Sequence, residues 1–359
     1  MLPLYQIGHA QYLSYDAGLK APADAYSILK KMGACDLPLS RPYSSVKIFN
    51  LFLLPLWICR FVWKIILLPF NSIVFVQLPS SEILNGRLGI WLLSVMRAIK
   101  KVHVIILVHD VNDLRHLRFS GTVQSKAYWN RINSIASILI VHNSRMAEWL
   151  ENVMGIARSK MVEIGLFDYL VSDFESKDCS SPASVTIAGN LSKWKAKYIT
   201  ELNKIQGVEW ELYGPNYEED ASSVNIHYHG SFSPEVIPTK LGNGFGLVWD
   251  GDSIDASKGD GGDYLQYLRY NNPHKVSLFL ACGMPVIIWR EAALADFILR
   301  NNIGLVINSL KEIPVLLRSL TSEQYHVMRG NVERIATKIR AGGFLTDAVN
   351  EAFRRLQCS

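Results

Sequence analysis

The chain has 359 residues, of which 49% are hydrophobic and 19% charged, and its formal net charge is +5. This composition excludes a mainly disordered chain, and the length exceeds what one hydrophobic core usually serves, so we expect two domains. The charge is too small to indicate nucleic-acid binding, and no arginine-rich tract or RNA-binding signature accompanies it. It does suit an anionic ligand or an acidic membrane surface.

Predicted strands and helices alternate through the first half of the sequence. Apolar and β-branched runs predict buried strands at residues 2–7, 73–78, 102–108 and 135–141. Residues 16–31 and 88–101 have the length and pattern of helices. This alternation predicts a parallel sheet with helices on both faces.

One apolar segment of this half, residues 48–70, is about long enough to span a bilayer. However, Arg60 and Lys64 lie inside it and Pro55 interrupts it, and each central charge costs about 2.5–3.5 kcal/mol on insertion scales. We therefore expect a helix that does not cross a membrane. It is either packed within the first domain or interfacial, with Arg41 and Lys47 also meeting anionic lipid.

The strand and helix pattern restarts after residues 173–183, a polar segment that we interpret as a linker. Strands are predicted at 185–188, 209–213, 246–249 and 285–289, and helices at 193–205, 275–281 and 346–356. Ligands of such sheets bind beyond the carboxyl ends of the strands, so the loops that follow strands are the place to look for a site.

Cysteine usage points to the compartment. The five cysteines are scattered, odd in number and without a CxxC pair, which indicates neither a disulfide framework nor a zinc site. No cleavable signal peptide is recognisable after Met1. We therefore expect a protein of the reducing cytoplasm.

Two loops of the second half lead to a lysine at the start of a predicted helix. In the first, Gly189 and Asn190 follow a strand, the helix start would offer free N–H groups, and Lys193 adds positive charge. An anion-binding loop and a plain turn fit this pattern equally.

The second loop runs from Asn271 to Lys275. Pro273 is expected near the first helical position, with Asn271 or Asn272 as the cap. His274 and Lys275 then lie in the first turn, where a lysine is unfavourable beside the positive end of the dipole unless an anion such as a diphosphate binds there. A solvated lysine beside a capped helix is the alternative.

Two further loops carry candidate ligand contacts. Asp250 and Asp252 follow a predicted strand; they allow a Mg²⁺ site, but a carboxylate that faces sugar hydroxyls is the interpretation we prefer. The glycines of 258–264 resemble a lid, since GxGxxG is absent. Tyr213 and Gly214 end another strand, where the backbone either holds a nucleotide base or forms a plain turn.

Three residues of the first half are candidates for a catalytic base. His109 and Asp110 end the strand at 102–108, and Asp16 opens a predicted helix. A carboxylate or imidazole at a cleft edge can take the proton of an attacking hydroxyl. A helix cap for Asp16 and a buried, hydrogen-bonded histidine for His109 are the alternatives.

Taken together, these stretches resemble a known family. The chain resembles the bacterial β-1,6-galactofuranosyltransferases of O-antigen and related surface-polysaccharide clusters, and more distantly the glucosyltransferases that extend glycans on streptococcal serine-rich adhesins. The matching stretches follow one another through nearly the whole chain: DAGLKA from Asp16, HDVNDLR from His109, FDYLVS from Phe167, AGNLSK from Ala188, YGPNYE from Tyr213, FGLVWDGDS from Phe245, NNPHKVSLFL from Asn271 and ALADFILRNNIG from Ala293. The apolar insert at 48–70 and the loop at 116–128 depart from the family.

The resemblance implies an α/β fold of the GT-B type, in which two Rossmann-like domains with parallel sheets enclose a cleft. Residues 1–172 would bind the acceptor and residues 173–359 the UDP-sugar, with the last helix a candidate to pack back on the first domain. The implied reaction is an inverting transfer of galactofuranose from UDP-galactofuranose to a hydroxyl of a glycan, with no cofactor and no metal.

The resemblance also carries over individual residues. It implies that Lys193 and Lys275 contact the diphosphate, and both groups of enzymes share His109 with Asp110. DAGLKA and NNPH occur in the galactofuranosyl group only and favour that donor. The candidate catalytic residues are thus Asp110, His109 and Asp16, and the candidate donor-binding residues are Gly189, Asn190, Lys193, Tyr213, Gly214, Asp250, Asn271, Asn272, His274 and Lys275.

Other functions stay open at this point. A glucosyl or other hexopyranosyl transferase fits the same fold, as does a sugar-nucleotide epimerase or a non-catalytic subunit that binds a sugar nucleotide. The expected partners are a UDP-sugar, a lipid-linked glycan acceptor and the inner membrane surface; a homo-oligomer is left open and no nucleic acid is expected.

Overall fold

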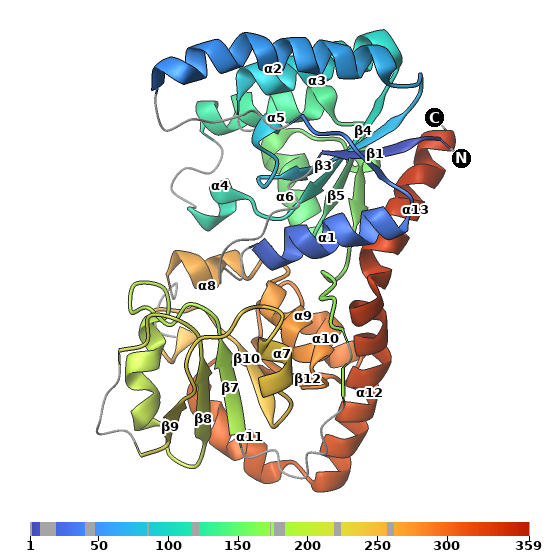
Figure 1. Ribbon diagram of the computed structural model, residues 1–359. Coiled ribbons are helices and arrows are strands. Elements are labelled where there is room, and N and C mark those ends of the chain that lie inside the picture. Colours follow the sequence, from blue (N-terminus) through green and yellow to red (C-terminus); the bar gives the residue numbers. More distant parts are fainter. Residues whose placement is uncertain are drawn as a thin grey trace.

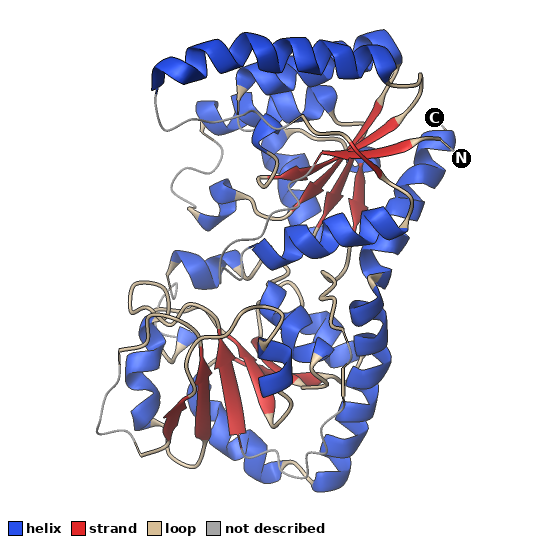
Figure 2. Cartoon of the chain, in the orientation of Figure 1, coloured by secondary structure: helices blue, strands red, loops and turns tan. Residues whose placement is uncertain are grey.

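The computed structural model describes residues 2–7, 19–39, 47–84, 86–116, 122–172, 174–175, 184–218, 224–256 and 262–358, without the side chains of 47–52, 82 and 123. Within these ranges the chain forms two α/β domains, and both ends of the chain lie at the first domain (Figure 1). Figure 2 shows each domain as a sheet between helices. The predicted architecture of two parallel-sheet domains is confirmed.

The first sheet has the order β2-β1-β3-β4-β5-β6, and all its neighbouring strands are parallel. Its strands are β1 (Leu4–Ile7), β2 (Cys35–Asp36), β3 (Ile73–Leu78), β4 (His103–Val108), β5 (Ile138–Val141) and β6 (Met161–Glu163). The central register pairs Val74 with Val104 and Ile105 with Ile138.

The second sheet repeats the plan with the order β12-β11-β10-β7-β8-β9, again parallel throughout. Its strands are β7 (Ser184–Ala188), β8 (Glu209–Tyr213), β9 (Ile226–Tyr228), β10 (Phe245–Val248), β11 (Val286–Trp289) and β12 (Gly304–Ile307). Because the strands are parallel, their carboxyl ends share one edge of each sheet.

Helices cover both sheets. Those before residue 175 are α1 (Lys20–Lys31), α2 (Lys47–Leu67), α3 (Arg87–Lys100), α4 (Asn112–Arg115), α5 (Val123–Ile135) and α6 (Ser144–Met154). Those after it are α7 (Ile237–Lys240), α8 (Asp263–Tyr267), α9 (His274–Ala281), α10 (Ala295–Arg300), α11 (Ile313–Ser319), α12 (Ser322–Ala341) and α13 (Gly343–Gln357). Short 3₁₀ helices lie at Glu82–Leu84, Arg158–Lys160, Lys197–Lys204 and Leu310–Glu312.

Two cores lie on opposite faces of the first sheet. Since the side chains of a strand point alternately to its two faces, neighbouring residues enter different cores. Val74 and Val104 pack with α2, α3, α5 and α6, whereas Ile73 and Ile105 pack with α1 and α13. All four are at most 2% exposed, so the sheet is buried on both faces, as parallel sheets are.

The last two helices join the domains. Gly342, between α12 and α13, has a φ of 80°, and a Cβ at this position would lie 2.6 Å from the side chain of Ile28 in α1. Asp168 accepts hydrogen bonds from the N–H groups of Phe344 and Leu345, at 3.1 and 2.8 Å. As a result α13 follows the second domain in sequence but packs against the first (Figure 1).

Helix α2 occupies the apolar segment of residues 48–70 and packs one face on the first domain. Trp57, Phe61 and Ile65 recur at helical spacing and are at most 7% exposed, and the Trp57 indole N–H donates to Leu39 O at 2.8 Å. In the part of the chain that the structure describes, no helix combines the length and apolar character needed to cross a membrane.

Two predictions about helix starts are wrong. The helix expected at 193–205 is replaced by a turn, in which Ser192 O accepts from the N–H groups of Lys195 and Ala196, followed by a 3₁₀ helix from Lys197. In the second loop, Pro273 is itself the residue before α9, and no side chain caps that helix. Of the two expected caps, Asn272 has other partners, described below, and Asn271 Oδ1 has none among the described residues.

Candidate active site

Charged side chains of both domains gather where strands of the two sheets end. Asp110 follows β4 and Asp250 follows β10, and Arg115, Lys195 and Lys275 lie near them. Burial is the main cause of the lowered pKa of Lys195, and the nearby cations Lys275 and Arg115 lower it further. The carboxylates Asp250 and Asp110 act in the opposite direction and raise it. This interdomain charge cluster holds three cations and two carboxylates, so its surplus charge suits an anionic ligand at the edge where such sheets bind ligands.

Lys275 forms the central ion pair of the second domain. Its Nζ donates to Asp250 Oδ1 at 2.5 Å and to Trp249 O at 3.3 Å. The Lys275 and Asp250 side chains are 21% and 15% exposed, so water screens the pair only partly. With one oxygen of Asp250 committed to a lysine, and no group of three or more potential metal ligands among the described residues, the Mg²⁺ alternative gains no support from the geometry.

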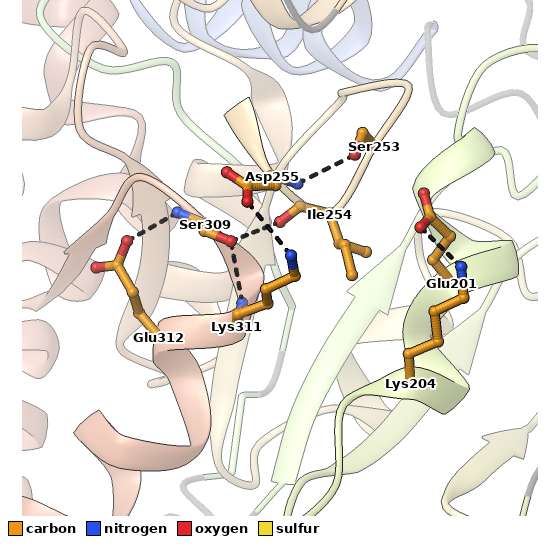
Figure 3. Close-up of polar contacts among 8 residues, drawn as sticks. All are labelled: Glu201, Lys204, Ser253, Ile254, Asp255, Ser309, Lys311 and Glu312. Carbon is orange, nitrogen blue, oxygen red and sulfur yellow. Dashed lines mark hydrogen bonds and ion pairs between the residues drawn. The ribbon is translucent and has the colours of Figure 1, made fainter. Parts of the chain in front are cut away.

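The loop that carries Asp250 is anchored farther along the chain. Ile254 O accepts from the Ser309 hydroxyl at 3.1 Å, and Asp255 pairs with Lys311 at 3.4 Å (Figure 3). Asp255 and Ser309 also form a β-bridge. These contacts tie the loop to the segment after β12.

Lys193 and Lys195 lie two residues apart and take different positions. Lys193 is 57% exposed and pairs with Glu218, itself 65% exposed; such surface pairs contribute little, so Lys193 can exchange this partner for a ligand. Lys195 is half-buried, with its Nζ 6.0 Å from the ring centre of Tyr264. Sequence reasoning missed Lys195 because it placed a helix here, and the second lysine of AGNLSKWK was the available signal.

Asp110 is bonded to both domains. Its Oδ1 accepts from Arg115 at 2.8 Å and from the Tyr267 hydroxyl at 3.1 Å, and that hydroxyl accepts from Val111 N–H at 3.1 Å. Tyr267 comes from α8, is 3% exposed, and burial raises its pKa, so it stays a donor. Asp110 remains 35% exposed. Sequence reasoning missed Tyr267 because a tyrosine in a short apolar helix resembles an ordinary core residue.

His109 is held in one tautomer. Its Nε2 lies 2.7 Å from Gln77 Oε1, while Gln77 Nε2 donates to Pro22 O at 3.2 Å. Gln77 Oε1 is therefore the acceptor, and the lone pair of His109 lies on Nδ1, which is buried without a partner among the described residues. Burial lowers the pKa of His109 to about 3, helped by His142 and His274, so this imidazole is neutral and only weakly basic at pH 7.

Asn272 connects the two domains. It is 3% exposed, and its Nδ2 donates to His142 O and Gly165 O at 2.7 and 2.8 Å. Its Oδ1 accepts from Asn143 at 2.7 Å, and its backbone N–H donates to His142 Nδ1 at 2.9 Å. The structure thus gives Asn272 a role in joining the domains, and the donor contact expected of it stays a prediction.

The two neighbours of Asn272 in this loop, His274 and Asn271, differ from each other in their contacts. His274 Nε2 contacts Asp168 O at 3.1 Å and its ring stacks on Tyr169 at 5.1 Å; burial lowers the pKa of His274 to about 4. This histidine also joins the domains. Asn271 Oδ1 is a buried acceptor without a partner among the described residues, so it keeps the capacity to bind a ligand.

The loops after β7 and β8 touch through two glycines. A Cβ on Gly214, whose φ is 144°, would lie 1.8 Å from Gly189 O, so only glycine fits. The Gly214 N–H donates to Gly230 O at 2.9 Å, and Gly214 O accepts from the Tyr228 hydroxyl at 2.9 Å. The backbone that was a candidate for holding a nucleotide base is therefore engaged within the domain.

Tyr213 and Asn190 are also engaged locally. The Tyr213 ring stacks on His229 with centres 4.6 Å apart, and Asn190 Oδ1 accepts from Ser192 N–H at 3.0 Å, which closes the turn that replaces the predicted helix start. Asp16 and residues 258–261 of the predicted lid lie outside the described residues.

A separate surface pocket contains none of the predicted site residues. It is lined by Arg158, Glu163, Glu351 and Arg355 with three neighbours, and these charges pair as Arg158–Glu163 and Arg355–Glu351. Because its charges neutralise one another, we assign it no chemistry.

Comparison with known proteins identifies the family. Residues 7–166 match the N-terminal domain of the glucosyltransferase 3-like family, and residues 185–352 match its C-terminal domain. The chain is also 33% identical to the β-1,6-galactofuranosyltransferase WbbI of Escherichia coli (strain K12) over 99% of both chains. The chain belongs to the glucosyltransferase 3-like family. Its glucosyltransferase 3 relative from Streptococcus gordonii is 32% identical over 39% of this chain and 42% of that protein.

Solved structures share the fold of this glucosyltransferase 3-like protein. Anabaena HepE in complex with UDP-glucose matches over the full length of both chains with a TM-score of 0.58 and 11% identity. Sucrose-phosphate synthase from Thermosynechococcus elongatus also matches over both full chains, with a TM-score of 0.65 and 11% identity. WaaG, a glycosyltransferase involved in lipopolysaccharide biosynthesis, covers 97% of this chain and 99% of its own at a TM-score of 0.55 and 10% identity.

These findings confirm the fold class and both resemblances drawn from the sequence. The fold is GT-B, and the protein is a glycosyltransferase. The identities to the solved structures establish the fold alone, so the donor, the acceptor and the roles of individual residues are taken up next as proposals.

Proposed function

We propose that the protein transfers galactofuranose from UDP-galactofuranose to a hydroxyl of a glycan acceptor, with inversion to a β-linkage and without a metal. The observation that carries this proposal is the 33% identity to a β-1,6-galactofuranosyltransferase over 99% of both chains. The two motifs typical of that group, DAGLKA and NNPH, support the same donor.

The reaction is a direct displacement at the anomeric carbon. The acceptor oxygen bonds to that carbon as its proton passes to a base, and the bond to the β-phosphate oxygen breaks with its electron pair staying on UDP. A base is therefore needed on one face of the sugar and cations on the other.

We assign the base to Asp110. Arg115 and Tyr267 orient its Oδ1, and its side chain is partly open to solvent. His109 is a poorer candidate because its free Nδ1 is buried and burial lowers its pKa to about 3. Asp16 lies outside the described residues, so it remains a candidate from the sequence alone.

We assign the departing diphosphate to Lys275 and Lys195, with Lys193 joining from the exposed side. Lys275 and Lys195 share the interdomain charge cluster with Asp250, and we assign the other carboxylate oxygen of Asp250 to accept a hydrogen bond from a sugar hydroxyl. The acceptor is proposed to be a lipid-linked glycan of surface-polysaccharide assembly, including the O-antigen of lipopolysaccharide, made at the cytoplasmic side of the membrane.

The donor assignment is tested by incubating the purified protein with UDP-galactofuranose, UDP-galactose and UDP-glucose, each with a simple alkyl glycoside acceptor. We expect a β-linked product from UDP-galactofuranose. Product from UDP-glucose alone would overturn the galactofuranosyl assignment in favour of a glucosyltransferase. The donors are also tested without acceptor, because conversion of the sugar would indicate an epimerase, and affinity without turnover a binding subunit.

A further inference from the structure

We propose that α2 and the exposed side of α3 form a docking face for an anionic lipid bilayer. In the described part of the chain, seventeen large apolar side chains are exposed, and nine of them fall between residues 56 and 99. Such concentration of apolar surface marks a binding face, since monomeric proteins rarely expose large contiguous apolar patches. The docking face comprises Leu56, Val62, Trp63, Ile66, Leu67 and Phe70, with Leu88, Trp91 and Ile99 of α3.

The outer side of α2 is also mostly apolar. Trp57, Phe61 and Ile65 face the core, whereas Leu56, Trp63 and Leu67, also at helical spacing, are 66%, 60% and 60% exposed. A helix that is apolar all round is normally buried on every side. Here the domain covers only one side, so the other requires a partner outside the domain.

The exposed side of α3 continues this surface. Lys100 Nζ donates to Ile66 O at 2.9 Å and lies 4.8 Å from the ring centre of Phe70, so the ends of α2 and α3 are in contact. Ile99 and Trp91 are 56% and 58% exposed. Both helices lie on the side of the first domain away from the second domain (Figure 1). Two exposed tryptophans on one basic surface are typical of a membrane interface, where the indole ring lies at head-group level.

The charge around this face fits anionic lipid. Residues 37–109 contain eight Lys and Arg but only one acidic residue, Glu82, which gives this segment +7, while the whole chain carries +5 and the remainder therefore −2. Within the described residues, Arg60, Lys64, Arg87 and Lys101 form no ion pair. Each cation near an anionic membrane strengthens binding about fivefold.

The same charge argues against self-association. A second copy that docked on this face would bring two segments of net charge +7 together, whereas a bilayer with anionic head groups neutralises this charge and takes up the apolar side chains. Of the two predictions for residues 48–70, this face supports the interfacial helix. Such a helix would hold the enzyme beside a lipid-linked acceptor. The inference does not depend on the donor sugar.

The test is sedimentation of the full-length protein with vesicles, without donor or acceptor. Vesicles of phosphatidylcholine alone are compared with vesicles that also contain phosphatidylglycerol. We expect binding to the anionic vesicles with a blue shift of tryptophan fluorescence, and release by high salt. The variant W63E/L67E should abolish binding, and R60E/K64E should weaken it by at least about 25-fold.

The matched control is V315E/V327E, which places the same charges at apolar positions of the second domain that are 60% and 53% exposed. This variant should bind as the wild type does, and circular dichroism should show that all variants are folded. Equal binding to both kinds of vesicle, unchanged binding of W63E/L67E, or a wild-type dimer that W63E/L67E converts to monomer would overturn the proposal. None of these results would alter the proposed reaction.

Discussion

Replacing Lys275 by alanine should lower kcat by about 10²–10³, the usual loss when a donor aimed at developing charge is removed. Lys275 Nζ is 2.5 Å from Asp250 Oδ1 and its side chain is only 21% exposed. Two unit charges 4 Å apart interact by about 4 kcal/mol at an effective dielectric constant of about 20, which matches a loss of that size. Lys195 remains in the cluster, so the double variant K195A/K275A should lose more than either single variant.

The assay is the initial rate of UDP release with saturating acceptor, from which kcat and KM are obtained separately. Lys204→Ala is the matched control, because Lys204 belongs to the same domain, is 64% exposed and pairs with Glu201 at 3.0 Å (Figure 3). It should leave kcat unchanged, and K275R should restore part of the lost rate because it restores the charge. A kcat for K275A within threefold of wild type, in a folded protein, would refute the role of Lys275 at the leaving group.

Three further outcomes follow from the site and its surroundings. Asp110→Asn should lower kcat by about 10²–10⁴, and Tyr267→Phe should shift the pH profile of kcat by removing one of the two hydrogen bonds to Oδ1 of that carboxylate; unchanged rates and profile in both would remove Asp110 from the mechanism. Chelation by EDTA should leave activity intact, and activity that is lost with EDTA and returns with Mg²⁺ would make Asp250 and Asp252 metal ligands. Burial holds the pKa of His274 at about 4 against 6.5 in the unfolded chain, so unfolded chains bind more protons between these values and stability falls as the pH falls through this window. We expect this residue to account for about 2 kcal/mol of the stability lost between pH 7.5 and pH 5, and denaturant unfolding of His274→Gln should show that much less acid sensitivity.

The strands were predictable from local sequence, but the site was predictable only in part. The local patterns of residues 73–78 and 209–213 predict strands, and the structure shows strands at these residues. Asp250 and Lys275 each stood out in a loop after a strand or before a helix. Their contact could not be predicted, because it depends on how β10 and α9 pack, and no local pattern encodes that distance.

The errors have a common physical cause. At residues 193–205 the periodicity suits a helix, but Asn190 bonds to Ser192 N–H and favours a turn, and this decides which of two lysines enters the charge cluster. Asn272 was expected to cap α9, but its side-chain amide donates hydrogen bonds to His142 O and Gly165 O instead. When a polar side chain has several possible hydrogen-bond partners, the whole fold determines which partner it takes.

The return of α13 to the first domain has a consequence for synthesis. Leu345, Ala348 and Val349 complete the core that α1 and one face of the first sheet begin, and all are at most 4% exposed. On the ribosome, Ile28 and Leu29 of α1 are made more than three hundred residues before these partners. The second domain can thus close its own core while one face of the first is still bare, so the first domain to emerge is the last to be completed.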